Sequence, residues 1–264
     1  MERDPVKNTP KIRYLTRREM LGLMGSTAVA VTLAGCGGGG GGTEQSSGKA
    51  GSGQTGTATE TASTTCVVRP EQTEGPYYVD TGLNRCDIRE EREGVPLDLT
   101  FSVSRVDEGD ASACGPLAGA VVDIWHCDAL GQYSGVRDNA AGDFDTRGET
   151  FLRGYQLTDE NGTARFTTIY PGWYQGRAVH IHFTIRDSPE SEQGYEFTSQ
   201  LYFEDALTDE VHSQGPYAEK GERDLRNGED GIFRGGGEEL LLDLVPNEEG
   251  YAARFDIALD TTYA

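Results

Sequence analysis

The chain has 264 residues, and its 44 acidic side chains outnumber its 23 Lys and Arg, so the formal net charge at pH 7 is −21. This balance argues against nucleic acid as a partner, because binding to phosphate groups relies on clustered Lys and Arg. The chain has four lysines, and its acidic residues are spread along the sequence. That pattern favours a surface that stays soluble in concentrated salt, as in a halophilic protein.

The first 35 residues predict a twin-arginine export signal. Arg17 and Arg18 precede a short apolar run of small residues at 23–34, which is too short to span a bilayer comfortably. The residues before Cys36 resemble a lipobox, in which that cysteine carries the lipid after processing; the alternative is a plain cleaved signal. We therefore expect export to the extracellular face of the membrane, with attachment only through an N-terminal lipid at Cys36.

Residues 36–65 are rich in Gly, Ser and Thr and almost devoid of large apolar side chains. Such a segment cannot offset the entropy of ordering, so the sequence predicts a flexible linker. The remainder, residues 66–264, is long enough for one domain with its own core. We see no second domain boundary and no internal repeat.

Four cysteines of this domain form an even set in an exported protein: Cys66, Cys86, Cys114 and Cys127. One or two disulfides are expected, with three full connectivities left open, and free buried thiols are an equal alternative. None of the four has the spacing of a metal ligand.

Alternation of apolar and polar residues dominates the domain and predicts strands rather than helices. Turn residues at 160–162 and 171–172 separate the strands, and no stretch keeps a helical period over three turns. We expect an all-β fold, a single β-sandwich of prealbumin or immunoglobulin-like type, with long loops at 138–149 and 187–194 and an ordered arm at 73–79. The predicted strands are 97–104, 120–125, 164–169, 179–185, 240–245 and 251–259.

Two of the four histidines, His180 and His182, lie one residue apart in a predicted strand. Side chains alternate between the faces of a strand, so both imidazoles point to one face and can bind one metal ion. A trivalent metal also needs anionic oxygen ligands, which Tyr174 and Tyr133 can supply if the metal removes the phenolic proton. Without these tyrosines, a chance pair of strand histidines would be the simpler interpretation.

A longer series of motifs agrees in order with one known family. The chain resembles the intradiol ring-cleavage dioxygenases, which include catechol 1,2-dioxygenases and protocatechuate 3,4-dioxygenases. Ordered agreement of this kind is far more specific than any single motif. The matching segments are TEGPYY (73–78), GAVVDIW (119–125), DALGQY (128–133), FLRG (151–154), TIYPGWY (168–174), Arg177, HIH (180–182) and QLYF (200–203).

The resemblance implies a mononuclear non-haem Fe(III) held by Tyr133, Tyr174, His180 and His182, with Arg177 and Gln200 beside it. It implies cleavage of a catecholic ring by O2 to a muconate-type diacid, in the catabolism of aromatic compounds. The substrates would be a small aromatic diol and O2. In that chemistry the released Tyr174 accepts a proton, and Arg177 stabilises negative charge on the ring.

Some features fall outside the resemblance. The helical N-terminal region through which catechol 1,2-dioxygenases dimerise has no counterpart here, so the oligomeric state is open, with a homo-oligomer among the alternatives. The preferred catechol is equally open. We expect Pro76 and Tyr77 at the substrate mouth, Trp125 and Trp173 in the core, and His126 and His212 in structural or solvated positions.

Two other classes of protein compete with this interpretation. A cupin-like or superoxide-dismutase-like metal site also uses histidines in a strand, but it needs further ligands for which the sequence offers no clear third imidazole. A non-catalytic exported β-sandwich that binds carbohydrate or a protein partner would hold no iron.

Overall fold

The computed structural model of the protein describes residues 66–107, 110–139, 143–187 and 194–261. The predicted signal, the predicted linker and the predicted lipidation site Cys36 lie outside these residues. In the described part of the chain, no helix is both long and apolar enough to cross a membrane. The strands are β1 (Pro96–Asp107), β2 (Asp110–Pro116), β3 (Val121–Trp125), β4 (Arg137–Asp138), β5 (Phe144–Asp145), β6 (Arg153–Leu157), β7 (Thr163–Ile169), β8 (His180–Arg186), β9 (Glu196–Tyr202), β10 (Leu244–Pro246) and β11 (Tyr251–Leu259).

The longest strand, β1, organises the first sheet, in which the order is β10-β11-β1-β2 and β7 also pairs with β1. β1 runs parallel to β11 on one side and antiparallel to β7 and β2 on the other. Its apolar residues alternate, so Leu99, Phe101 and Val103 share one face and are all buried.

The second sheet has the order β6-β3-β8-β9, and all its neighbours are antiparallel. Every residue of β3 is buried, as are the residues of β8 from His180 to Ile185. Both faces of these two central strands are therefore covered, one by the first sheet and the other by loops and the arm. The candidate metal ligands lie on the second of these faces.

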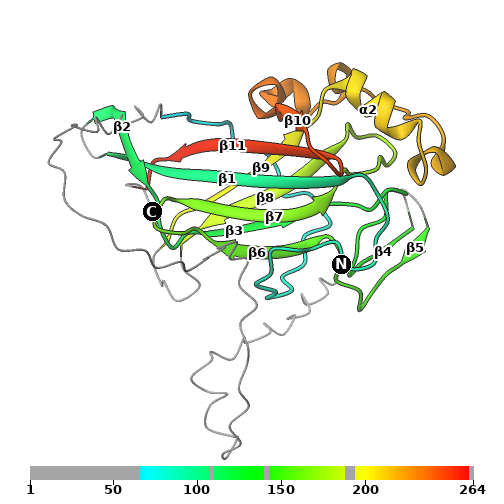
Figure 1. Ribbon diagram of the computed structural model, residues 1–264, viewed down its shortest axis with the longest axis horizontal. Coiled ribbons are helices and arrows are strands. Elements are labelled where there is room, and N and C mark those ends of the chain that lie inside the picture. The colour runs from blue at the N-terminus through cyan, green and yellow to red at the C-terminus, as the bar shows by residue number, and fades with distance from the viewer. Residues whose placement is uncertain (1–65, 108–109, 140–142, 188–193, 262–264) are drawn as a thin grey trace, which may run out of the picture. The chain divides into compact units, whose positions relative to one another are not determined.

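Aromatic rings join the inner faces of the two sheets, which Figure 1 shows lying against each other. The Phe101 ring of β1 lies 5.3 Å from the Phe183 ring of β8, and the Phe183 ring lies 5.5 Å from the Phe255 ring of β11. Each of these buried side chains contributes about 1.5–3 kcal/mol relative to exposure. The all-β class is confirmed, whereas the prealbumin or immunoglobulin-like type stays a prediction.

Short helices follow β9 at one end of the strands, where Figure 1 shows them in yellow and orange. The α-helix is α2 (Asp205–His212), and its eight residues are too few to give a helical period over three turns. It is followed by the 3₁₀ turns η1 (Tyr217–Lys220), η2 (Asn227–Glu229), η3 (Phe233–Gly235) and η4 (Gly237–Leu240).

The predicted strand at 240–245 is largely wrong. Residue Leu240 ends η4, and only Leu244 and Val245 belong to β10. The apolar run here contributes to the core without forming a strand. Leu240 and Leu242 are both buried, and an isolated bridge joins Leu241 to Tyr202.

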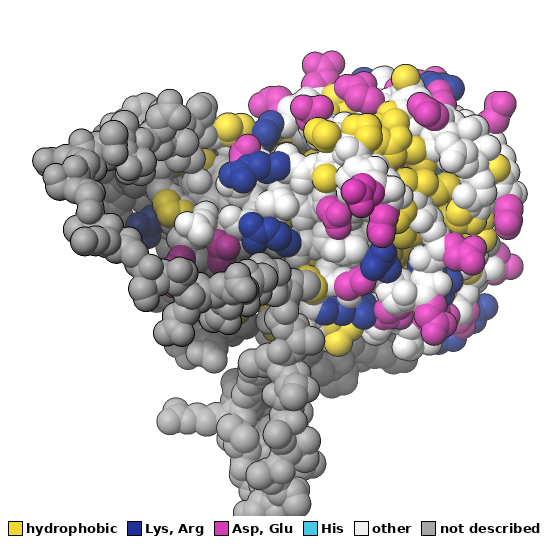
Figure 2. Space-filling model, viewed as in Figure 1, with side chains coloured by type: hydrophobic (Ala, Val, Ile, Leu, Met, Phe, Trp, Pro, Cys, Tyr) yellow, Lys and Arg dark blue, Asp and Glu magenta, His cyan; other side chains and the backbone are white. Residues whose placement is uncertain are grey.

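A disulfide joins Cys66 to Cys114 and ties the beginning of the described domain to β2. The thiol of Cys127 is free, buried and placed to donate to the carbonyl of Gly172 at 3.4 Å. The domain therefore contains both a disulfide and a free buried thiol, the two alternatives that the sequence left open. On the face drawn in Figure 2, acidic side chains are scattered among basic and apolar ones.

Candidate metal centre

Four buried side chains converge at the end of the second sheet where β3 ends and β8 begins. The Nε2 atom of His180 lies 3.0 Å from Nε2 of His182, 3.2 Å from the hydroxyl of Tyr174 and 3.5 Å from the hydroxyl of Tyr133. None of the four residues is more than 8% exposed. The structure thus brings together all four residues that were predicted from the sequence as metal ligands.

The backbone explains how these residues meet. Residues His180 and His182 project from the same face of β8, as their spacing predicted. The loop after β3 supplies Tyr133, and the turn before β8 carries Tyr174 back over the first imidazole. The loop after β3 requires a glycine at position 131. Gly131 has φ +80°, and a Cβ there would lie 2.1 Å from the carbonyl oxygen of Trp173.

Hydrogen bonding and stacking fix the orientation of both imidazoles. The Nδ1–H of His180 donates to the carbonyl of Ala178 at 2.6 Å, so Nε2 carries the lone pair and faces the other three groups. The ring of His182 stacks on Trp125, with centroids 5.1 Å apart and planes 3° apart. Trp125 stands opposite His182 in the register between β3 and β8, so a residue predicted for the core also orients a candidate ligand.

Burial sets the protonation of all four groups. It lowers the pKa of both His180 and His182 well below the ordinary value, so both rings are neutral and have lone pairs to offer. Burial also raises the pKa of Tyr133 well above 10, and it raises that of Tyr174 to about 12 although the charge of Arg177 acts in the opposite direction. A cation at the shared point would ionise these phenols, as metals do to coordinated oxygen and sulfur groups.

The donor set fits a single metal ion. Two ligand atoms that each lie about 2.1 Å from an ion, at roughly 90–110° to one another, are about 3.0–3.4 Å apart, close to the separations around His180. Among the described residues no three His, Cys, Asp or Glu side chains gather to hold a metal, so a metal here would need the phenol oxygens. Two imidazoles and two phenolates suit iron, for which tyrosinate ligation has precedent. Ligation itself stays a prediction.

Arg177 and Gln200 lie beside the four side chains. The Nη1 atom of Arg177 is 3.4 Å from Nε2 of His180, and its Nη2 donates to Oε1 of Gln200 at 2.6 Å. Gln200 is fully buried and stands opposite His182 in the register between β8 and β9. Its Nε2 donates to the carbonyl of Thr73 at 2.8 Å, which links this pair to the arm.

The arm at 73–79 lies against the centre. The Tyr77 ring stacks on Tyr133 with centroids 4.5 Å apart, and its hydroxyl donates to Asp138 at 2.8 Å. Gly75 sits so close to the metal-site imidazole that a Cβ there would approach Cε1 of His182 to 3.2 Å. Of the two residues expected at the substrate mouth, Tyr77 contacts a candidate ligand, and Pro76 is exposed.

The remaining two histidines are structural. His126 is fully buried, donates through Nδ1 to the carbonyl of Cys127 and pairs through Nε2 with Thr168. His212 donates through Nε2 to the carbonyl of Pro171 and stacks on Tyr217.

One buried carboxylate beside the centre was missed in the sequence. Asp230 accepts a hydrogen bond from Nε of Arg177 at 2.9 Å. It stands among many acidic residues of the C-terminal segment, where no local pattern distinguishes it. The signal that would have found it is the unpaired charge of a buried Arg177, which needs a partner.

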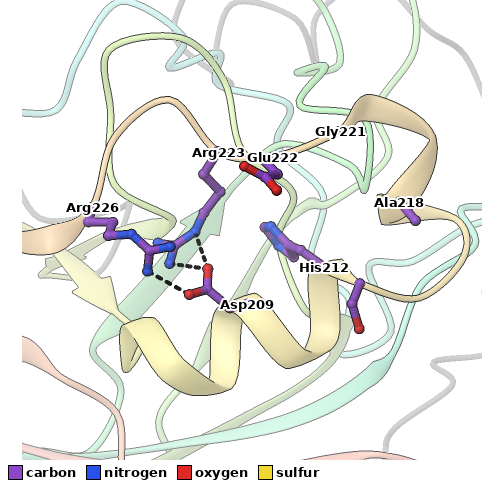
Figure 3. A pocket seen from close by; sticks show the side chains of 8 residues that line it. Asp209, His212, Ala218, Gly221, Glu222, Arg223 and Arg226 are labelled. Carbon is purple, nitrogen blue, oxygen red and sulfur yellow. Dashed lines mark hydrogen bonds and ion pairs between the residues drawn. The ribbon is translucent and has the colours of Figure 1, made fainter.

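A surface hollow of about 480 Å³ opens near α2 and is separate from the centre, because none of the four candidate ligands lines it. Figure 3 shows Arg223 and Arg226 reaching Asp209 across it. The two arginines and Asp209 form ion pairs with one another, so we interpret this hollow as a salt-bridged surface and not as a catalytic site.

An all-β domain in which two histidines and two tyrosines meet at one buried point offers a donor set that a single metal ion would need. Comparison with known proteins identifies the family. Residues 73–260 match the model of the Dioxygenase family, and the chain belongs to the intradiol ring-cleavage dioxygenases.

Relatives of known structure support this membership. An intradiol ring-cleavage dioxygenase from Tetranychus urticae is 31% identical, with a TM-score of 0.65 over 74% of this chain and 95% of that one. The dioxygenase domain of a carbohydrate-binding fusion protein from Streptomyces sp. SirexAA-E is 29% identical, with a TM-score of 0.51 over 74% of this chain and 99% of that one.

A curated relative, chlorocatechol 1,2-dioxygenase from Pseudomonas putida, is 31% identical over 156 residues, which are 50% of this chain and 52% of that protein. The chain spans about half the length of the curated relatives it matches.

Proposed function

We propose that the protein is an Fe(III)-dependent intradiol dioxygenase, which opens the ring of a small catechol with O2 to give a muconate-type diacid. Its ligands would be Tyr133, Tyr174, His180 and His182. The observation that carries the proposal is the convergence of the other three side chains within 3.0–3.5 Å of Nε2 of His180. Membership of the intradiol family adds the type of reaction.

Ferric iron held there would make a bound catecholate ring susceptible to attack by O2. The protein's own part is to hold and move protons. Tyr174 is the better of the two phenols for release as a phenolate, because the Arg177 charge lowers its pKa relative to what burial alone would give. A freed phenolate at this position can take a hydroxyl proton from the diol as it binds.

Arg177 is suited to stabilise negative charge that develops on the substrate. Its guanidinium is 15% exposed, keeps its charge at all relevant pH values and reaches within 3.4 Å of the imidazole nitrogen. The guanidinium is held in place by Gln200, whose Oε1 accepts a hydrogen bond from Nη2 of Arg177 at 2.6 Å. Such preorganised donors in a site that excludes water are a major source of rate enhancement.

The alternative, a non-catalytic binding module, is not favoured. A module that bound its partner on the surface would gain nothing from a buried cluster of two imidazoles and two phenols, because desolvating these polar groups costs free energy. The cluster is explained if it binds a metal.

The test is the spectrum and turnover of the full-length protein loaded with iron. Tyrosinate ligands to Fe(III) should give a wine-red colour through a visible charge-transfer band, and O2 uptake should accompany formation of the ring-opened product. Catechol, protocatechuate, hydroxyquinol and chlorinated catechols form the substrate panel. Iron-loaded protein that is colourless and consumes no O2 with any of them would refute the proposal.

The location of the protein is part of the same proposal. The twin arginines and Cys36 support export and lipid attachment at the extracellular face of the membrane. Expression in a host with and without a functional twin-arginine pathway, followed by membrane fractionation of wild type and Cys36→Ala, tests both steps. Secreted Cys36→Ala that still sediments with membranes would contradict the lipid anchor.

A further inference from the structure

Asp230 is a buried carboxylate beside the candidate metal centre that accepts four hydrogen bonds. Its side chain is 2% exposed. One oxygen, Oδ2, accepts from Nε of Arg177 at 2.9 Å and from the backbone N–H of Ala178 at 2.9 Å. The other, Oδ1, accepts from the backbone N–H groups of Ile232 and Phe233 at 2.7 and 3.3 Å.

These bonds keep the carboxylate charged inside the protein. Burial alone would raise the pKa of Asp230, but the Ala178 N–H and the Arg177 charge outweigh it, and the pKa is lowered. A carboxylate fixed by two backbone donors on one oxygen is a rigid anchor for the guanidinium bound to the other.

The anchor acts on the centre by two short routes. Through Nε it fixes the plane of Arg177, whose Nη2 then meets Gln200 at 2.6 Å and whose Nη1 lies 3.4 Å from His180. It also accepts a hydrogen bond from the N–H of Ala178, the residue whose own carbonyl accepts the Nδ1–H of His180 at 2.6 Å. One carboxylate therefore holds both a charge-stabilising group and a candidate ligand.

We propose that Asp230 is a positioning residue for ring cleavage, which aims the Arg177 guanidinium at the reacting substrate; this inference rests on the proposed function. It also gives the C-terminal segment around η2 and η3 a role in the reaction, because that segment supplies Asp230. Loss of such supporting contacts typically costs about 10- to 100-fold in activity or metal affinity.

The first variant is Asp230→Asn, which keeps the shape but replaces one acceptor oxygen by an NH2 group that faces donors. The iron-loaded, full-length variant should keep its tyrosinate band while kcat falls about 10- to 100-fold. The matched control is Asp209→Asn, which removes a carboxylate from another buried arginine, Arg223, across the hollow in Figure 3. The control should turn over at the wild-type rate.

A double-mutant cycle separates positioning from general stability. If Asp230 acts on turnover through Arg177, and not through Ala178 and His180, Asp230→Asn should lower kcat no further in an Arg177→Gln background. Should Asp230→Asn fail to fold, Asp230→Glu carries the same test, because it keeps the charge and moves the carboxylate by one methylene.

Two results would overturn the inference: a kcat within about twofold of wild type, or a loss that multiplies with that of Arg177→Gln. The wild-type enzyme separates this failure from that of the proposed function. A red, active wild type with an unaffected Asp230 variant refutes only the positioning role, whereas a colourless and inactive wild type refutes both.

Discussion

The close approach of the arm to the centre gives a sharp prediction for Gly75→Ala. Gly75 has φ +75°, and an added Cβ would lie 3.2 Å from Cε1 and 3.7 Å from Nε2 of His182. The substitution therefore combines two costs, a left-handed backbone and a contact that pushes a candidate ligand. The variant Gly82→Ala isolates the first cost, because Gly82 has φ +60° and nothing lies within 4 Å of its Cβ.

The magnitudes follow from these two geometries. An alanine in the left-handed region costs about 1–2 kcal/mol, which lowers Tm by about 2–8 °C in a domain of this size. Both variants should show this loss. Only Gly75→Ala should also displace the His182 ring by a few tenths of an ångström, so iron affinity or kcat should fall by about tenfold in this variant alone.

The assay is thermal unfolding by circular dichroism together with the visible band and kcat of iron-loaded protein. Equal Tm losses with a functional defect confined to Gly75→Ala would support the contact between arm and ligand. If both alanine variants had the spectrum and kcat of wild type, the prediction that the arm constrains the ring of His182 would be wrong.

Three further predictions concern other parts of the domain. Tyr174→Phe should weaken or shift the tyrosinate band and reduce kcat by at least about 100-fold, because a proton acceptor is lost; an unchanged spectrum would remove Tyr174 from the ligand set. Burial lowers the pKa of His126 to about 4, below the value of about 6.5 that applies in the unfolded chain. The protein therefore has its full free energy of unfolding above about pH 6.5, and about 3 kcal/mol of that free energy is lost as the pH falls towards 4. The urea midpoint of His126→Gln should accordingly change less between pH 7 and 4.5 than that of wild type, and equal changes would contradict the assignment. Replacing Cys66 and Cys114 together by Ser removes a disulfide that spans 48 residues. The free energy of unfolding should fall by about 2–4 kcal/mol, or about 5–15 °C in Tm, and the visible band should stay intact. A Tm unchanged from wild type would show that the disulfide adds no stability.

Strands that bury one side only were predictable from their alternation. β1, β7 and β11 have apolar residues at every second position, and the predicted ranges agree with the observed ones to within a few residues. β9 was missed because the buried positions Ser199 and Gln200 are polar. They are satisfied by the carbonyls of Pro70 and Thr73, more than a hundred residues away in the chain, and no local pattern contains that information.

The candidate metal centre likewise combines residues that a local pattern places and residues that only the tertiary fold places. The spacing of His180 and His182 makes their common face a property of any strand, so the sequence could place them. The role of Asp230 depends on a hydrogen bond to a residue 53 positions away, and the stacking of Trp125 on His182 depends on strand pairing. Both contacts arise only when the tertiary fold is formed.

The parallel pairing of β1 with β11 has a consequence for synthesis of the protein. β1 leaves the ribosome early, but its neighbour on that side, residues Tyr251–Leu259, is among the last parts of the domain to be made. Until then β1 exposes unpaired backbone groups that invite intermolecular association. The layer that supports the histidine-bearing strand is therefore completed only near the end of translation, and nascent chains arrested before Tyr251 should aggregate instead of accumulating as soluble intermediates.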